Sequence, residues 1–147
     1  MPLLRTLAIA AVLSVAFTGF AAAEWRFNPD RGNNGQAVSE GENRTRFLID
    51  CGPGGIGMFL FRRTELTGEM AAVIAVDGNR IGGRLTCDAQ TCQFSPETGD
   101  EALALGQNLR RGETARLRAA GSLVDSYSLR GSARAIDALR DRTQCRI

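Results

Sequence analysis

The amino-acid sequence predicts a mainly β domain, an antiparallel β-sandwich or half-barrel with two short helices, the last of them docked by a disulfide. Three observations predict this class. Short apolar or alternating segments are separated by turns rich in Gly, Asn and Asp, which is typical of strands in hairpin order. Only two segments carry apolar residues at helical spacing. The repeated strand–helix–strand alternation of a parallel sheet is missing. We expect six or seven strands.

The first segment, Met1 to Ala23, has the three parts of a secretory signal peptide. Arg5 supplies the positive charge, Leu7 to Phe17 form the apolar run, and small residues ending at Ala23 form a cleavage site. The run is shorter than the roughly 20 apolar residues of a spanning helix. We therefore expect cleavage, a single mature domain over residues 24–147 located in the periplasm or secreted, and no transmembrane segment in that domain.

The mature chain begins with segments of contrasting character. Trp25 to Phe27 alternates and predicts a first strand, whereas Asn28 to Asn43 contains many turn residues and no apolar period, which predicts a loop. Arg46 to Ile49 then reads as a strand. A turn over Cys51 to Gly55 precedes Ile56 to Phe61, which is apolar enough for a buried strand.

The middle of the chain predicts a hairpin. The apolar run Met70 to Val76 is followed by Asp77-Gly78, a strong hairpin signal, and Arg80 to Cys87 forms the return strand. Gly82-Gly83 within it indicates a bulge or a close backbone approach.

A helix follows. Thr98 and Glu101 have the spacing of a capping box, Leu105 and Leu109 follow at helical spacing, and Gly112 ends the helix.

The last third predicts one more hairpin and a second helix. Thr114 to Ala119 alternates cleanly, and Leu123, Tyr127 and Leu129 should share one face of the returning strand. Ser132 is a suitable N-cap for a final helix. That helix would turn Ile136 and Leu139 inward and Arg134, Asp137 and Arg140 outward.

Four cysteines lie in the mature part, an even count that predicts two disulfides in an exported chain. Of the three connectivities we favour Cys87–Cys92 together with Cys51–Cys145. The first pair would face across a tight hairpin, and the second would attach the last helix to the domain. Zinc binding and redox chemistry are the alternatives. A single C-x₄-C spacing and the absence of C-x-x-C disfavour both.

The composition excludes much chemistry. The 18 basic residues are all Arg, because the sequence contains neither Lys nor His. A lysine Schiff base, a P-loop lysine and a histidine-based catalytic couple are therefore ruled out. The mature charge is close to balanced, which argues against nucleic acid as a partner. The sequence predicts no cofactor.

Two sets of charged residues remain as candidates. Arginine pairs could form an anion-binding surface, since guanidinium groups bind carboxylates and phosphates bidentately. These pairs are Arg44/Arg46, Arg62/Arg63, Arg110/Arg111 and Arg116/Arg118. Two carboxylates could perform acid–base chemistry if the fold brought them together. The candidates are Asp50, Glu65, Glu69 and Asp125.

The second half of the chain resembles a known family. The order of an apolar strand, Val76-Asp77-Gly78, a Cys-containing hairpin, a short helix, an alternating strand and a terminal helix resembles the invasion-associated locus B family of small exported alphaproteobacterial proteins. The most telling residues are Ser128, Leu129, Gly131 and Ala135, in an S-L-x-G-x-x-x-A pattern. The resemblance implies a periplasmic or surface β-sandwich linked to host-cell interaction, with no catalytic residues to transfer.

Together these observations predict an exported, non-enzymatic protein that binds another protein or an envelope component. One alternative is an inhibitor or immunity-type protein, with Asn28 to Asn43 as its contact segment. A carboxylate-based hydrolase is the second alternative.

Overall fold

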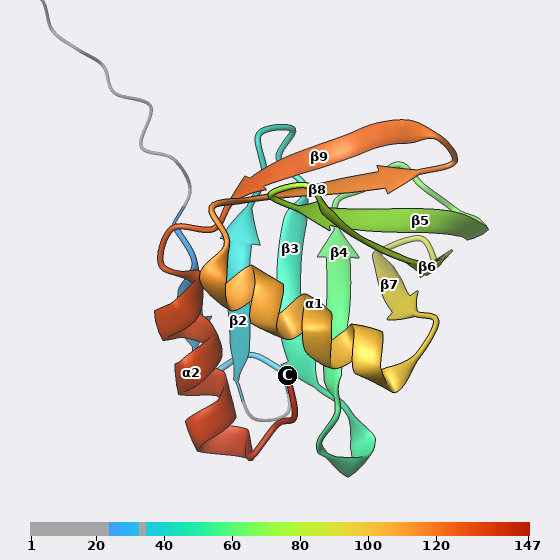
Figure 1. The fold of residues 1–147 in the computed structure, drawn as a ribbon. Coiled ribbons are helices and arrows are strands. Elements are labelled where there is room, and N and C mark those ends of the chain that lie inside the picture. Colours follow the sequence, from blue (N-terminus) through green and yellow to red (C-terminus); the bar gives the residue numbers. More distant parts are fainter. Residues whose placement is uncertain (1–23, 33–34) are drawn as a thin grey trace, which may run out of the picture.

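The computed structural model describes residues 24–32 and 35–147, so the expected signal peptide lies outside the described residues. Nine strands form one antiparallel sheet in the order β1-β2-β3-β4-β7-β6-β5-β8-β9 (Figure 1). The strands are β1 (Arg26–Asn28), β2 (Gln36–Glu40), β3 (Arg46–Cys51), β4 (Gly57–Arg62), β5 (Gly68–Val76), β6 (Asn79–Cys87), β7 (Thr91–Pro96), β8 (Thr114–Ala119) and β9 (Ser122–Ser128). A 3₁₀ turn (Pro53–Gly55) and two helices, α1 (Gly99–Arg111) and α2 (Ser132–Thr143), complete the fold.

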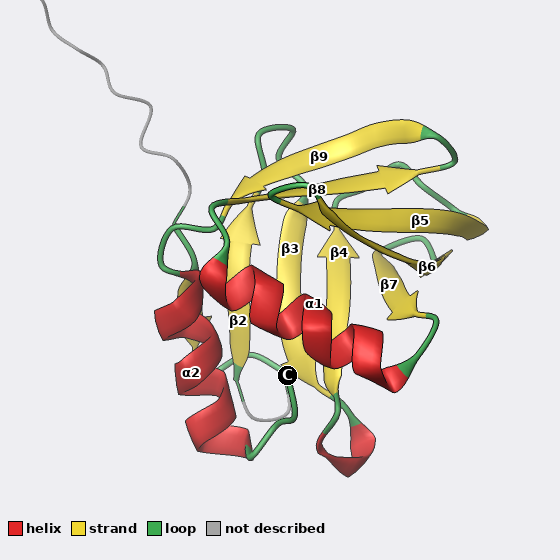
Figure 2. Ribbon diagram, in the orientation of Figure 1, coloured by secondary structure: helices red, strands yellow, loops and turns green. Residues whose placement is uncertain are grey.

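The sheet is a half-barrel and not a two-sheet sandwich. It curls until its last strand, β9, lies beside β2, and we call the line where they meet the seam. The two helices cover the concave side, where α1 packs on β6 and β7 and α2 packs on β1, β2 and β3 (Figure 2). The predicted mainly β class with two helices is confirmed, and of its two forms the half-barrel is the correct one.

An aromatic cluster fills the concave side near the seam. Phe47 on β3 stacks on Phe61 of β4, with ring centroids 4.5 Å apart. Trp25 and Tyr127 each meet Phe47 edge-on, with ring centroids 5.2 Å away. All four side chains are buried, so residues from both ends of the chain share one core.

The predicted hairpins of the second half are present. β5 and β6 pair around Asp77-Gly78, and Asp77 adopts a positive φ of 47° as such tight turns require. A side chain at Gly83 would collide with the carbonyl oxygen of Ser95, which confirms the expected close backbone approach. The capping box of α1 is also formed, with Thr98 and Glu101 bonding each other's backbone N–H.

Two strand predictions are wrong. Nine strands replace the expected six or seven, and the segment read as a loop from Asn28 to Asn43 contains β2, Gln36–Glu40. Gln36, Val38 and Ser39 mix polar and apolar types on both faces, so the alternation that identifies a half-buried strand is weak. The segment forms a strand because it pairs with β1 on one side and β3 on the other.

Leu123 does not share a face with Tyr127 and Leu129. The pairing of β8 with β9 shifts between Leu117 and Arg118, so that Asp125 pairs with Leu117 but Leu123 pairs with Arg118. This bulge reverses the side-chain alternation. Tyr127 and Leu129 are buried, whereas Leu123 is 46% exposed on the convex side.

Ser132 is not the N-cap of α2. Gly131 occupies that position in the left-handed conformation, with φ 80° and no side-chain cap. The Ser132 hydroxyl instead donates to the Leu109 carbonyl oxygen of α1 at 2.7 Å. The serine therefore links the two helices, a role that spacing alone does not reveal. Ile136 and Leu139 point inward as expected.

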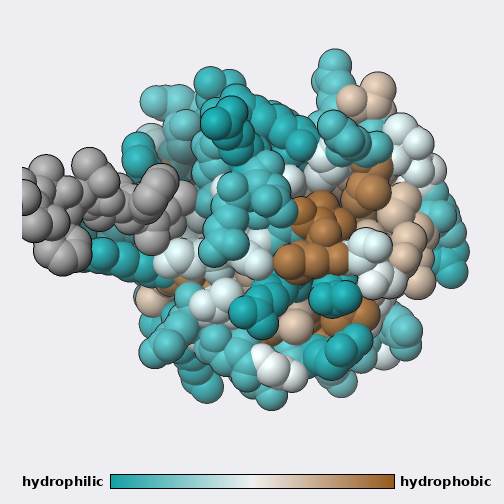
Figure 3. Space-filling view, turned by 90° about the horizontal axis from the view of Figure 1, so that it is seen from above, coloured by the Kyte–Doolittle hydropathy of each residue, from teal (hydrophilic) through white to brown (hydrophobic). Residues whose placement is uncertain are grey.

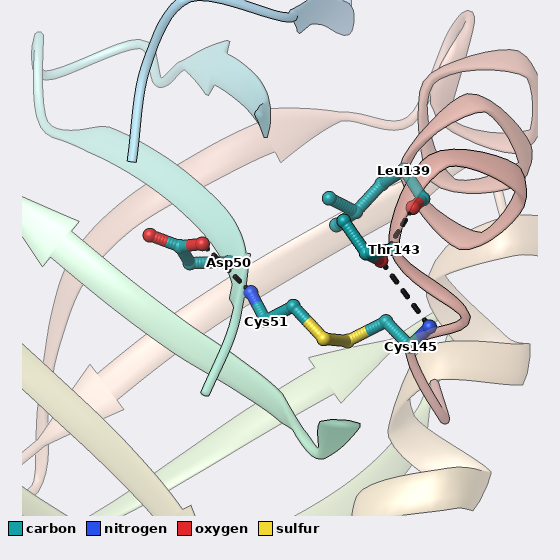
Figure 4. Close-up of a disulfide and its surroundings, with 5 residues drawn as sticks. All are labelled: Asp50, Cys51, Leu139, Thr143 and Cys145. Carbon is teal, nitrogen blue, oxygen red and sulfur yellow. Dashed lines mark hydrogen bonds between the residues drawn. A yellow bond between two sulfur atoms is a disulfide. The ribbon is translucent and has the colours of Figure 1, made fainter. Parts of the chain in front are cut away.

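The cysteines form the disulfides Cys51–Cys145 and Cys87–Cys92, the pairing favoured from the sequence. Cys87 and Cys92 are direct cross-strand partners, with Cα atoms 3.9 Å apart. Cys145 follows α2 and reaches the end of β3, where the backbone N–H of Cys51 donates to Asp50 (Figure 4). On the other side, Thr143 accepts from the Cys145 N–H. This bridge attaches the end of α2 to the sheet.

Neither helix of the described part of the chain is long and apolar enough to cross a membrane.

Candidate binding groove

A groove of about 1040 Å³ lies on the convex side of the sheet, along the seam. We call it the seam groove. Residues of β1, β2, β3 and β4 form one side, and Ser126 and Ser128 of β9 form the other. Its charged residues are Glu24, Arg26, Arg31, Glu40, Glu42, Arg46 and Arg62.

Alternation along the strands places the floor of this groove. Phe47 and Ile49 of β3 face the core, so Leu48 faces the convex side beside Val38 of β2. Leu48 is only 4% exposed although it is no member of the hydrophobic core. Leu48 is therefore largely covered by its neighbours, and the half-buried Val38 is the apolar side chain that the groove exposes.

Buried polar groups close the end of the groove at Gln36. Gln36 lines the groove, and its side-chain N–H donates to the Asp50 carboxylate at 2.8 Å. Asp50 also accepts from the Cys51 backbone N–H at 2.7 Å. The backbone of Gly32 lies so close to this carboxylate that a Cβ would collide with it. The Asp50 site is therefore covered by chain and fixes Gln36 in place.

Four arginines, Arg26, Arg31, Arg46 and Arg62, line the groove, all of them exposed. Arg46 and Arg62 are direct cross-strand partners on β3 and β4. Two adjacent guanidinium groups repel each other unless an anion lies between them. Within residues 24–32 and 35–147, none of the four forms an ion pair. The carboxylate of Glu40 instead approaches Arg63, at 4.0 Å.

A buried aspartate holds the two sides of the seam together. Asp125 of β9 accepts hydrogen bonds from the backbone N–H groups of Asn43 and Thr45, at 2.8 and 2.9 Å. Burial raises the pKa of the neighbouring Tyr127 above its ordinary value, and the charge of Asp125 raises it further. Tyr127 therefore stays protonated near neutral pH, and its ring remains a fixed part of the seam.

Trp25 closes the lower part of the same seam. Its backbone N–H donates to the Arg130 carbonyl oxygen at 2.9 Å, and its indole N–H donates to the Ser128 carbonyl oxygen at 3.0 Å. Asp125 and Trp25 thus fix the position of β9, and with it the serine side of the groove.

The structure separates the arginine pairs expected from the sequence. Arg46 and Arg62 meet in the groove, whereas Arg44 and Arg63 lie in turns with positive φ. Of the others, Arg110 binds Asp137 on α2, and Arg116 and Arg118 lie on the convex face of β8. Sequence reasoning missed Arg26 and Arg31. The alternation of Trp25, Arg26 and Phe27 was the available signal for Arg26.

The carboxylate candidates do not converge. Asp125 bonds the backbone at Thr45, and Asp50 lies five residues further along the same extended segment, about 16 Å away at about 3.3 Å per residue. Glu69 pairs with Arg84 on the far part of the sheet, and Glu65 lies between β4 and β5. In the described part of the chain, no group of three or more potential metal ligands lies together. All the cysteines there are in disulfides.

Comparison with known proteins adds no relative: no family model matches the chain, and neither a curated protein nor a solved structure is significantly similar to it.

Proposed function

We propose that this protein is an exported, non-enzymatic binding protein that holds an anionic partner, a protein or an envelope component, in the seam groove. The observation that carries the proposal is the set of four groove arginines, against three groove glutamates; none of these arginines forms an ion pair within 4.0 Å among the described residues. Arginine binds carboxylates through two parallel charge-assisted hydrogen bonds, which gives both affinity and geometry.

The shape and composition of the groove narrow the choice of partner. Val38 and Leu48 supply an apolar floor, while the side chains of Gln36, Ser126 and Ser128 supply hydrogen-bonding groups along its length. A bare inorganic anion would leave the floor uncovered. An extended segment that carries both carboxylates and apolar groups, such as an acidic peptide, would use the floor and the arginines together.

Export is supported by two features. The segment Met1 to Ala23 has the pattern of a cleaved signal peptide, and disulfides persist in oxidising compartments such as the periplasm. The resemblance of the second half to the invasion-associated locus B family points to the same location and to a binding role at the cell surface.

Inhibition of another exported protein is a form of the same proposal. The segment expected to make contact, Asn28 to Asn43, contributes Asn28, Arg31 and residues of β2 to the groove. An exported enzyme that inserts an acidic segment there would be blocked, and a pulldown from a periplasmic extract would return it as the partner. A hydrolase is not proposed, because Asp50 and Asp125 lie far apart.

The test measures binding of a fluorescein-labelled oligoglutamate peptide by anisotropy, with an oligolysine peptide for comparison. We expect the mature protein to bind the glutamate peptide alone and R46E/R62E to bind it at least tenfold more weakly, since a charge-assisted bond is worth about 1.5–3 kcal/mol. The matched control is R134E/R142E, which reverses two exposed charges on α2. Equal losses in the two double variants would contradict the proposal.

A further inference from the structure

Beyond Glu69, the convex face of β5 carries only small side chains. Ala72, Ile74 and Val76 face the core, so the alternate residues Ala71, Val73 and Ala75 face outward. Long side chains stand on the strands to either side. The centre of this face is therefore low, apolar and narrow, bounded by β6 and β8.

Arginines occupy both flanking strands. Arg80 of β6 and Arg116 of β8 are the two cross-strand partners of Ala75, so their Cα atoms lie about 10 Å apart across β5. Arg84 pairs with Ala71, and Arg118 pairs with Val73. We call these four arginines and the small residues between them the arginine-framed face.

Most of this charge is free to bind. Arg84 forms an ion pair with Glu69, and Arg118 donates to the Gly121 carbonyl oxygen at 3.2 Å. Within the described residues, Arg80 and Arg116 form no ion pair. A net excess of guanidinium groups therefore surrounds an apolar centre.

Leu123 extends the apolar area. The bulge in β9 turns it to the convex side beside Arg118, where it is 46% exposed. Figure 3 looks down on the side of the molecule where Figure 1 places β5, β8 and β9, and it shows a hydrophobic area surrounded by hydrophilic side chains. An exposed apolar area with a polar border is typical of an interaction surface.

We propose that the arginine-framed face binds the surface of an anionic lipid bilayer. The partner must offer negative charge to arginines on both sides and an apolar environment to the exposed Leu123 beside them. A bilayer surface offers both, because phosphate groups lie directly above the acyl chains. Arginine suits this position, since its apolar stem can remain with the acyl chains while the guanidinium reaches the phosphates.

A planar partner fits better than a small ligand. Ala71, Val73 and Ala75 are too short to build walls of their own, so the face lacks the enclosing side chains that hold a compact ligand. The seam groove, in contrast, encloses its floor. The two surfaces are thus distinct in shape, and this proposal stands whether or not the groove binds its partner.

The test is co-sedimentation of the mature protein with vesicles made of equal parts phosphatidylcholine and phosphatidylglycerol. We expect binding that disappears at high salt and is absent from pure phosphatidylcholine vesicles. R80E/R116E should bind at least about 25-fold more weakly, because each lost arginine contributes about fivefold and each new glutamate is repelled by the anionic surface. L123S should also weaken binding, whereas R134E/R142E, the same charge reversal on α2, should leave it unchanged.

Three results would overturn the proposal. One is the failure of the wild-type protein to sediment with the anionic vesicles. Another is equal binding by R80E/R116E, with circular dichroism showing that it is folded. The third is the absence of vesicle binding together with capture of an acidic protein from an extract by the wild type but not by R80E/R116E. That result would assign this face to a protein partner.

Discussion

The two halves of the sheet are held together by different means. Within β5 to β9, three hairpins pair sequence neighbours, and β5 also pairs with β8 across α1. Strands β1 to β4 also pair in sequence order, but residues from the opposite end of the chain close the seam beside them. Asp125 binds their β2–β3 turn, Trp25 binds the end of β9, and Cys145 binds Cys51. The candidate groove lies along this seam, where distant contacts hold β9 in place.

This difference teaches where the stability of the groove comes from. Forming a hairpin closes a loop of only a few residues, so its entropic cost is small. Forming a seam between distant segments closes a long loop, and its entropic cost is larger. Contacts that close the seam should therefore affect stability more than contacts of the same chemistry in the local half.

The two disulfides give the largest contrast. Cys51–Cys145 joins residues separated by 94 positions, and Cys87–Cys92 joins residues separated by 5. On the chain-entropy model, C51A/C145A should lose about 4.7 kcal/mol of unfolding free energy and C87A/C92A about 2 kcal/mol. Urea unfolding of both double variants measures the ratio. A larger loss in C87A/C92A would show that the local half is the weaker one.

Two aspartates offer the same contrast with hydrogen bonds. Asp125 accepts from the backbone of Asn43 and Thr45 in a fully buried site, at 0% exposure. The exposed Asp77 accepts from the backbone of Glu113 and Thr114, at 2.8 and 3.0 Å. Each carboxylate thus accepts from two backbone N–H groups of another segment, but Asp125 is buried and also accepts from the Ser126 N–H at 2.7 Å.

Replacing each aspartate with Asn compares a buried set of backbone hydrogen bonds with an exposed one. The new amide group turns its NH₂ towards a backbone N–H. In D125N water cannot relieve this conflict, so we expect a loss of about 2–3 kcal/mol. In D77N water solvates the freed N–H, and Asn tolerates the positive φ, so the loss should stay below about 1 kcal/mol. Equal losses in urea unfolding would mean that the seam is open to water.

The capping box of α1 gives a smaller effect within the local half. The Thr98 hydroxyl accepts from the Glu101 backbone N–H at 3.2 Å at an exposed helix start. T98A should cost about 1 kcal/mol, and T98S, which keeps the hydroxyl, should cost much less. If T98A has no effect on urea unfolding, the cap contributes nothing beyond what water supplies.

The same division decides how much of the fold the sequence predicts. The β5–β6 hairpin, the Cys87–Cys92 turn and the start of α1 are encoded by residues within a few positions of each other, and each is predicted correctly. β2 is missed, because Gln36 to Glu40 has no strand pattern of its own and forms by pairing with β1 and β3. The bulge that exposes Leu123 is likewise set by pairing.

The groove follows the same rule. Arg46 and Arg62 are recognisable as candidates, but only the register of β3 and β4 places them side by side. Arg26 and Arg31 enter the groove because β1 pairs with β2, a strand that is itself not predictable from its residues. A site whose geometry depends on strand register cannot be assembled from local patterns, even when some of its residues are identified.

The smallest effect concerns the ion pair between the helices, which connects the two halves. Arg110 of α1 donates two hydrogen bonds to Asp137 of α2, at 2.8 and 2.9 Å. The hydrogen bond from Arg110 lowers the pKa of Asp137 below its ordinary value, with the guanidinium charge acting in the same direction. The pair thus stabilises the fold above the ordinary carboxyl pKa, and this stabilisation is lost as the pH falls through the pKa of Asp137 in the folded protein.

R110Q should return the pKa of Asp137 towards its ordinary value, which carbon NMR titration of the carboxyl group measures directly. The stability difference between R110Q and the wild type should be small at neutral pH, because both side chains are more than a third exposed, and it should vanish in acid. R111Q, at the neighbouring exposed position of α1, is the matched control. A difference that persists below the pKa of Asp137 would show that Arg110 connects the two halves through packing and not through charge.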